Sequence, residues 1–228
     1  MRVLLVAVVV LLGLALVADR VAAELAEDRV AEAIAEQGDL AGAPAVDVTG
    51  FPFLTQAVGG RYEDVRISLS AEDLGRPEGT RADVSLRGVH VPLSAVLSGS
   101  VEEVPVDRIE GTATLSYALL SEQLGPDTTL TREGDGLRIT RTVELMGQTV
   151  PLTAVGTVEV DGDDLVIDVE EASGAGVDVP DFLVEEAADL LDLRYPVELP
   201  FGLQLTEVSP AEEGVQVSAE ATDTVLRA

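Results

Sequence analysis

The 228-residue chain contains no cysteine, no tryptophan and a single histidine. Without cysteine there can be no disulfide, no thiolate zinc site and no cysteine nucleophile. The lone His90 sits in a strand-like pattern between two valines, so a histidine triad of the usual kind and a multi-histidine metal site are both excluded. Neither a G-x-S-x-G elbow nor a glycine-rich phosphate loop occurs. We therefore predict a protein that is not an enzyme and that binds no metal and no cofactor.

Positive charge is also scarce. All 14 basic residues are arginine, against 42 acidic residues, which leaves a formal net charge of −28. Such a surface repels nucleic acids and anionic membranes, so we predict no nucleic-acid partner. The acidic cluster DGDD at 161–164 lacks calcium-loop spacing and is typical of a hairpin turn. Because acids are so abundant, chance pairs are expected, and a carboxylate-dependent envelope hydrolase stays a remote alternative.

The N-terminus carries an uncharged apolar run from Val3 to Ala18, closed by Asp19 and Arg20. The run is somewhat short for a membrane span of about 20 residues and suits the apolar segment of a secretory signal. Small residues at 21–23 could be accepted by signal peptidase, yet the helical pattern continues past them without a turn. We predict export to the cell envelope or periplasm. Residues 1–20 are either a cleaved signal peptide, leaving a soluble protein, or a retained signal anchor in the cytoplasmic membrane.

The rest of the chain predicts one α+β domain over residues 21–228. A helix is expected at 20–37, with an apolar stripe of Ala23, Ala26, Val30, Ala33 and Ile34. Period-two alternation then indicates antiparallel strands with one apolar face. The strands are expected at 65–69, 82–91, 108–115, 136–145, 149–160, 165–169, 197–205 and 215–221, with short helices at 92–99, 115–125 and 180–193. A long curved meander would wrap its apolar face around one or two helices.

Two of the four phenylalanines lie in the stretch TGFPFLTQAVGGRYEDV, residues 49–65. Phe51, Phe53 and Leu54 form an apolar cluster around Pro52, followed by a short helix that would end at a glycine pair. The cluster is either a plug on the core or a lipid-facing lip. Arg61 and Arg66 would supply polar groups near its mouth, or else pair with the neighbouring acids Glu63 and Asp64.

The G-F-P-F-L-T-Q element, a following glycine and a V-x-I-x-L strand resemble the actinobacterial LmeA family of envelope proteins. The resemblance covers most of residues 20–228, and only residues 49–69 carry a specific likeness. The resemblance implies a phospholipid-binding envelope protein related to tubular lipid-binding folds, with an apolar groove and no catalytic residues. It also implies a role in assembly of lipid-linked, lipomannan-type envelope glycans. If lipid is bound as the resemblance implies, we predict that its contacts are Phe51, Pro52, Phe53, Leu54, Val58, Arg61, Arg66, Ile67 and Leu69.

Two further expectations follow. If the protein carries no lipid, the alternative is an N-terminally anchored scaffold that supports an integral-membrane glycosyltransferase. A membrane glycosyltransferase is also the protein partner that we consider for the lipid-binding protein. If the apolar cluster is a lipid-facing lip, replacing Phe53 and Leu54 by aspartate should weaken lipid binding while the domain stays folded.

Overall fold

The computed structural model describes residues 2–125, 127–145, 148–162, 164–174, 177–178, 194–196 and 199–227. The chain forms an α+β domain whose residues group into two compact units. The first unit comprises Met1–Leu69, Asp83–Ile109 and Ala221–Ala228, and the second comprises Ser70–Ala82 and Glu110–Glu220. Neither unit is continuous in sequence. The predicted α+β class with antiparallel strands is confirmed.

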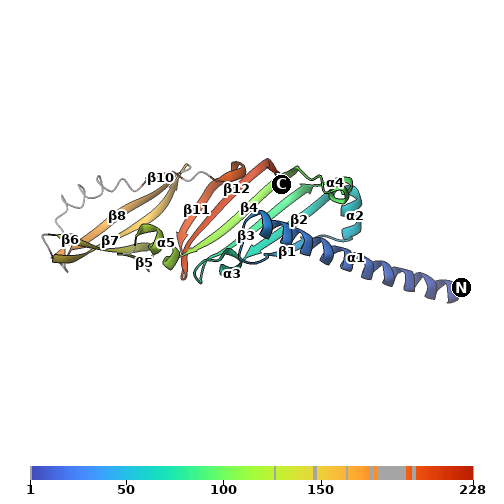
Figure 1. Ribbon diagram of the computed structural model, residues 1–228, viewed down its shortest axis with the longest axis horizontal. Helices are drawn as coiled ribbons and strands as arrows, with labels where there is room; N and C mark the ends of the chain where they lie inside the picture. Colours follow the sequence, from blue (N-terminus) through green and yellow to red (C-terminus); the bar gives the residue numbers. More distant parts are fainter. Residues whose placement is uncertain are drawn as a thin grey trace. The chain divides into compact units, whose positions relative to one another are not determined.

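The N-terminal helix α1 is one continuous element, Arg2–Gln37 (Figure 1). By length and composition it could cross a membrane, a test that a signal sequence also passes. Its buried residues, Asp19, Ala23 and Ala31, share one face because they lie four and eight residues apart. The predicted stripe is wrong in detail, since Val30 and Ala33 are exposed. The buried face of α1 includes the acidic residue Asp19. Apolar periodicity alone therefore placed the buried stripe about one residue away from its observed position.

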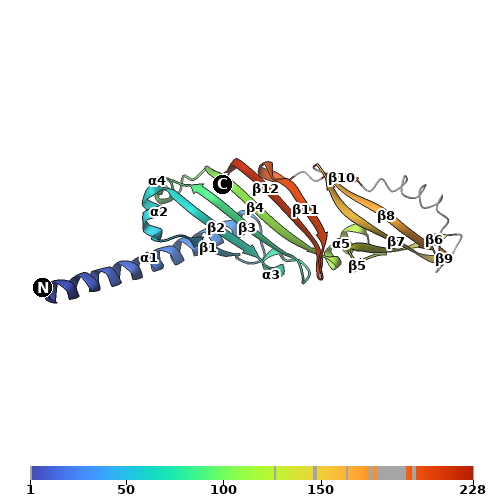
Figure 2. The same cartoon turned by 180° about the vertical axis from the view of Figure 1, so that it is seen from behind.

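One six-stranded sheet has the order β1-β2-β3-β4-β12-β11 (Figures 1 and 2). The pair β1/β2 is antiparallel, with Val48 opposite Val65, and β11/β12 is antiparallel with a bulge after Leu205. The last strand of the chain therefore pairs on one side with its sequence neighbour β11 and on the other with the distant strand β4. The strands are β1 (Ala45–Thr49), β2 (Arg61–Leu69), β3 (Arg81–His90), β4 (Glu103–Ser116), β11 (Gln204–Pro210) and β12 (Gly214–Arg227).

The other sheet has the order β10-β8-β7-β6-β5, with β9 paired to β8. Its strands are β5 (Thr128–Glu133), β6 (Gly136–Leu145), β7 (Gln148–Asp161), β8 (Asp164–Gly174), β9 (Val177–Asp178) and β10 (Arg194–Pro196). The hairpin predicted at 161–164 is confirmed, because Asp161 pairs with Asp164. A second hairpin joins β5 to β6, where Glu133 pairs with Gly136. The cluster DGDD thus spans a β-hairpin turn.

Short helices lie between several of the strands. They are α2 (Phe53–Gly59), α3 (Ala71–Leu74), α4 (Leu93–Ser98), α5 (Tyr117–Leu124) and the 3-10 turn η1 (Pro200–Gly202). The predictions at 92–99 and 115–125 are confirmed, and the helix predicted at 180–193 lies outside the described residues. The strand predicted at 197–205 is wrong across η1, where Phe201 adopts a φ of 61° and Pro200 has no N–H for a ladder.

Each unit buries its own apolar residues. In the first unit they include Phe53, Ala57, Val65, Val106 and Ile109. In the second, Leu130, Leu137 and Val215 form a buried cluster against which Tyr117, Leu120, Ile139, Val158, Val208 and Val217 pack.

Candidate functional site

The α2 segment has two faces, both apolar. Phe53 and Ala57, four residues apart, are 5% and 7% exposed, and they fasten the helix to the first unit. On the adjacent, outward side of the helix Leu54 and Val58, also four apart, are 42% and 76% exposed, and Phe51 just before the helix is 59% exposed. The cluster expected at 51–54 is therefore divided between a core anchor and a surface.

The burial of Phe53 changes one expectation. Phe53→Asp would place a carboxylate among buried side chains, which costs several kcal/mol. We now expect the Phe53/Leu54 aspartate pair to disrupt folding, so this pair cannot test lipid binding. Leu54 and Val58 are the positions where a surface role can be tested.

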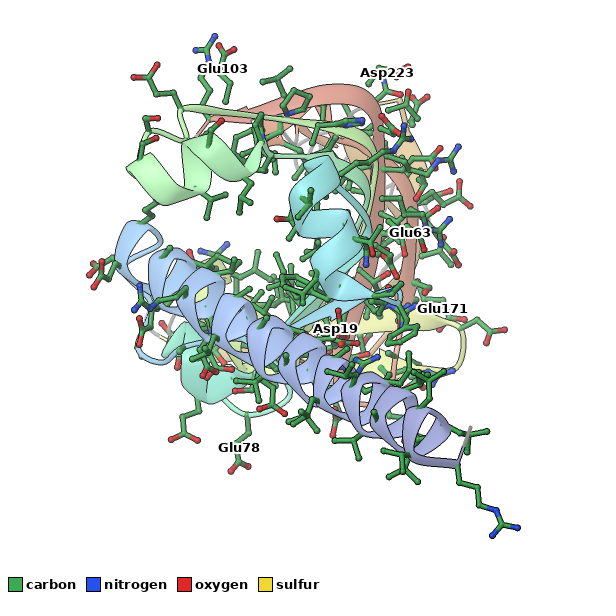
Figure 3. The ribbon with its side chains drawn as sticks, turned by 90° about the vertical axis from the view of Figure 1, so that its right-hand side faces the viewer. Asp19, Glu63, Glu78, Glu103, Glu171 and Asp223 are labelled. Atoms are coloured by element: carbon green, nitrogen blue, oxygen red, sulfur yellow. The ribbon has the colours of Figure 1, made fainter. Side chains whose placement is uncertain are left out.

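The first turn of α2 is capped from a distance. Pro52 occupies the N-cap position and makes no side-chain cap. Instead Asp19 of α1, only 3% exposed, accepts hydrogen bonds from the N–H groups of Phe53 (3.1 Å) and Leu54 (2.9 Å). Figure 3 shows Asp19 where α1 passes the start of α2. A carboxylate at this end of a helix satisfies free N–H groups and suits the helix dipole.

Two further contacts fasten α1 around Asp19. The guanidinium of Arg20 lies 5.6 Å from the centre of the Phe51 ring, a cation–π distance. Two turns later along α1, Glu27 accepts a hydrogen bond from the N–H of Val48 at 2.9 Å. The junction between the apolar run and the folded body is thus held by side chains on both sides of residues 21–23.

Both arginines proposed for the mouth are in ion pairs. Arg61 binds Asp107 at 2.8 Å and Arg66 binds Asp64 at 2.9 Å, with 62% of each arginine side chain exposed. Pairing with a neighbouring acid was one of the two readings for Arg66, whereas Asp107 comes from a different strand. Gly88 is the reason Asp107 can approach, because a Cβ at that position would collide with its carboxylate. His90 lies 3.8 Å from the same carboxylate.

The remaining predicted residues lie along β2. Ile67 and Leu69 are half-buried on the same face as buried Val65, as the alternation predicts. Tyr62 packs its ring 6.1 Å from that of Phe53, and burial raises the pKa of its hydroxyl. The nine predicted residues thus fall into two groups, one around α2 and one along β2.

A second uncharged stretch adjoins α2. Residues 49–60 and 91–101 contain no charged side chain, and α2 contacts α4. The N–H of Val91 donates to the carbonyl of Gly60 at 3.0 Å, and a Cβ on Gly60 would sit 3.1 Å from the Cα of Pro92. We call residues 49–60 and 91–101 the uncharged tip. Its exposed large apolar side chains include Phe51, Leu54, Val58 and Val96.

The sequence model of the LmeA-like phospholipid-binding family matches residues 17–220. The chain belongs to this family. No curated protein matches it significantly. Membership in the LmeA-like family supports phospholipid binding. The matched region begins at Val17, so it includes Asp19 and Arg20 together with the whole of the uncharged tip.

Sequence reasoning missed Asp19, Glu27 and the α4 half of the tip. Asp19 looked only like the charge that ends an apolar run. One signal points toward it: the α2 helix follows a proline, which has no side-chain oxygen to cap it, so its first N–H groups are left available to an acceptor from elsewhere in the chain. Among the described residues no group of three or more acidic or histidine side chains could hold a metal ion.

Proposed function

We propose that this LmeA-like protein is an exported, non-catalytic envelope protein that binds phospholipid through an apolar groove with the uncharged tip at its entrance. The observation that carries the proposal is the apolar outer surface of α2 in a chain of the LmeA-like phospholipid-binding family. Phe51, Leu54 and Val58 offer acyl chains an apolar surface, and each methylene removed from water contributes about 0.8 kcal/mol.

We propose a different role for each of the other predicted residues. Ile67 and Leu69 continue the apolar face of β2, while Pro52 shapes the entry to α2 and Phe53 holds it to the core. Arg61 and Arg66 are exposed enough to exchange their carboxylate partners for a lipid phosphate, with Arg geometry suited to a phosphate. The role we propose for the bound lipid is in assembly of lipid-linked, lipomannan-type envelope glycans.

A second candidate function is that of a scaffold. The single unbroken α1 helix favours it, because an anchored body could support a membrane glycosyltransferase without carrying lipid. Lipid content separates the two candidates. The carboxylate hydrolase gains no support from the described geometry.

Native mass spectrometry of the full chain, purified in detergent from membranes and followed by solvent extraction, tests the proposal. We expect an excess mass that extracts as phospholipid, and its loss in the Leu54→Ser/Val58→Ser variant. Val225→Ser is the matched control, since Val225 is 44% exposed on β12 of the same unit. A chain that carries no lipid and takes up none from liposomes would contradict lipid carriage and put the scaffold first.

A further inference from the structure

Three uncharged parts of the chain meet at one end of the first unit. The apolar run of α1, residues 3–18, projects from the end where α2 and α4 lie (Figures 1 and 2). Because Asp19 binds the N-terminus of α2, the outer face of α2 is fixed directly beside the end of this run. Exposed apolar surface is therefore continuous from a helix able to cross a membrane to the uncharged tip.

The contacts of Asp19 and Ala23 bear on whether the N-terminal segment is removed. Cleavage after Ala23 would take away Asp19 and Arg20. It would leave the Phe53 N–H, which lies in a buried hydrogen bond, without its partner. Ala23 itself is helical and 3% exposed, between the two carboxylates that fasten α1 to the body. The family match beginning at Val17 independently places this junction inside the domain.

From these contacts we infer that the N-terminal helix stays on the mature protein as a membrane anchor. The hydrogen bonds of Asp19 to the first turn of α2, which we call the latch, hold α2 beside the anchor. The uncharged tip lies at the headgroup–acyl boundary of the same bilayer. This goes beyond the proposed function, because a chain that carries no lipid could still be anchored and seated in this way.

Helix length supports this placement. The 16 apolar residues from Val3 to Ala18 extend about 24 Å, less than the roughly 30 Å of a bilayer core. A short span draws its flanking residues toward the bilayer, which brings the tip to the depth of about 5–10 Å that interfacial apolar faces occupy. The tip has no charge to desolvate, while the net charge of −28 disfavours the rest of the surface near anionic lipid.

Retention is tested by the intact mass of the full chain after export and extraction from membranes in detergent. We expect a mature N-terminus upstream of Asp19 and resistance to alkaline carbonate washing. A mature chain that begins at Glu24, or at any position after Asp19, would overturn the anchor.

Seating of the tip is tested by depth-dependent quenching, which the absence of cysteine makes clean. A bimane label at Val58→Cys is compared with one at Glu36→Cys in full-chain proteoliposomes of phosphatidylcholine containing a spin-labelled phosphatidylcholine. Glu36 is exposed on α1 about 25 Å beyond Asp19, so it serves as the control. We expect severalfold stronger quenching at Val58, and equal quenching at the two positions would overturn the seating.

The latch is tested by adding Asp19→Ala to the labelled Val58→Cys chain. The chain should remain membrane-embedded while the quenching at Val58 falls toward that of Glu36. Asp19→Asn, which keeps one acceptor oxygen, should fall between, and it replaces the alanine variant if circular dichroism shows that variant to be unfolded. Unchanged quenching in the folded variant would overturn the role of Asp19.

Discussion

The helices α2 and α5 are nearly equal in length, seven and eight residues, yet their first turns are capped in different ways. In α5 the preceding residue, Ser116, accepts the N–H of Leu119 at 3.2 Å. In α2 the preceding residue is Pro52, and the acceptor is Asp19, 34 residues away from Phe53. The outer surfaces differ as well, because α5 carries the exposed acid Glu122 and α2 carries no charge.

This difference separates two uses of a cap. A cap from the adjacent residue defines where a helix begins and depends only on local sequence. A cap from another helix is a tertiary contact, and it ties the position of α2 to that of α1.

The largest effect is expected at the buried side of α2. Phe53→Ala should lower the free energy of unfolding by about 3–5 kcal/mol, because a large side chain is lost from a packed site. Phe51→Ala, which removes an exposed ring and its contact with Arg20, should cost less than about 1 kcal/mol. Urea unfolding followed by circular dichroism compares the two, and equal losses would contradict the division of the cluster.

The caps come next. Asp19→Ala should cost about 1–3 kcal/mol, since a buried N–H loses its acceptor. Ser116→Ala should cost about 0.5–2 kcal/mol for the cap, and it also removes the acceptor of the buried Thr80 hydroxyl at 3.0 Å. Hydrogen–deuterium exchange read by mass spectrometry should show faster exchange in α2 for the first variant and in α5 for the second. Unchanged exchange of α2 in Asp19→Ala would show that the long-range cap is dispensable.

A negative charge introduced on the outer face should weaken phospholipid binding when it is placed on α2 and not when it is placed on α5. Leu54→Glu/Val58→Glu should reduce phospholipid affinity at least about tenfold, or 1.4 kcal/mol, with little change in folding. Leu124→Glu is the matched control, because Leu124 is 38% exposed on α5. Phospholipid bound per chain gives the readout, and an equal loss in both variants would remove the distinction between the two surfaces.

The smallest effect concerns α3, a third helix with a local cap. The Ser70 hydroxyl, and then the Ser70 N–H, hold the pKa of Asp73 below its usual range. Because the folded-state pKa is the lower one, the stabilisation is present at neutral pH and is lost as the pH falls through that pKa. Ser70→Ala should raise the pKa of Asp73, and Ser70→Thr should preserve it, in an NMR titration of the carboxyl carbons. The same pKa in all three chains would show that the hydroxyl has no effect.

Sequence reasoning succeeded where the determinants are local. Alternation and turn residues located the β7–β8 hairpin at DGDD, and Gly60 marked the end of α2, where it adopts the left-handed conformation. Sequence reasoning failed where a contact depends on residues that are far apart in the chain. Nothing near Asp19 indicates that it caps α2, and nothing near β4 indicates that β12 will pair with it. At Pro200–Gly202 the apolar alternation is real, but proline and a left-handed backbone break the strand.

The pairing of β4 with β12 also sets an order in time. Residues 117–213 must be made before β12 can join the sheet, whereas Asp19 and Phe53 are separated by 34 residues. Contacts between distant segments form slowly because closing a long loop costs entropy. The connection between α1 and α2 can therefore form while the chain is still emerging, and the sheet is completed only when the C-terminus arrives.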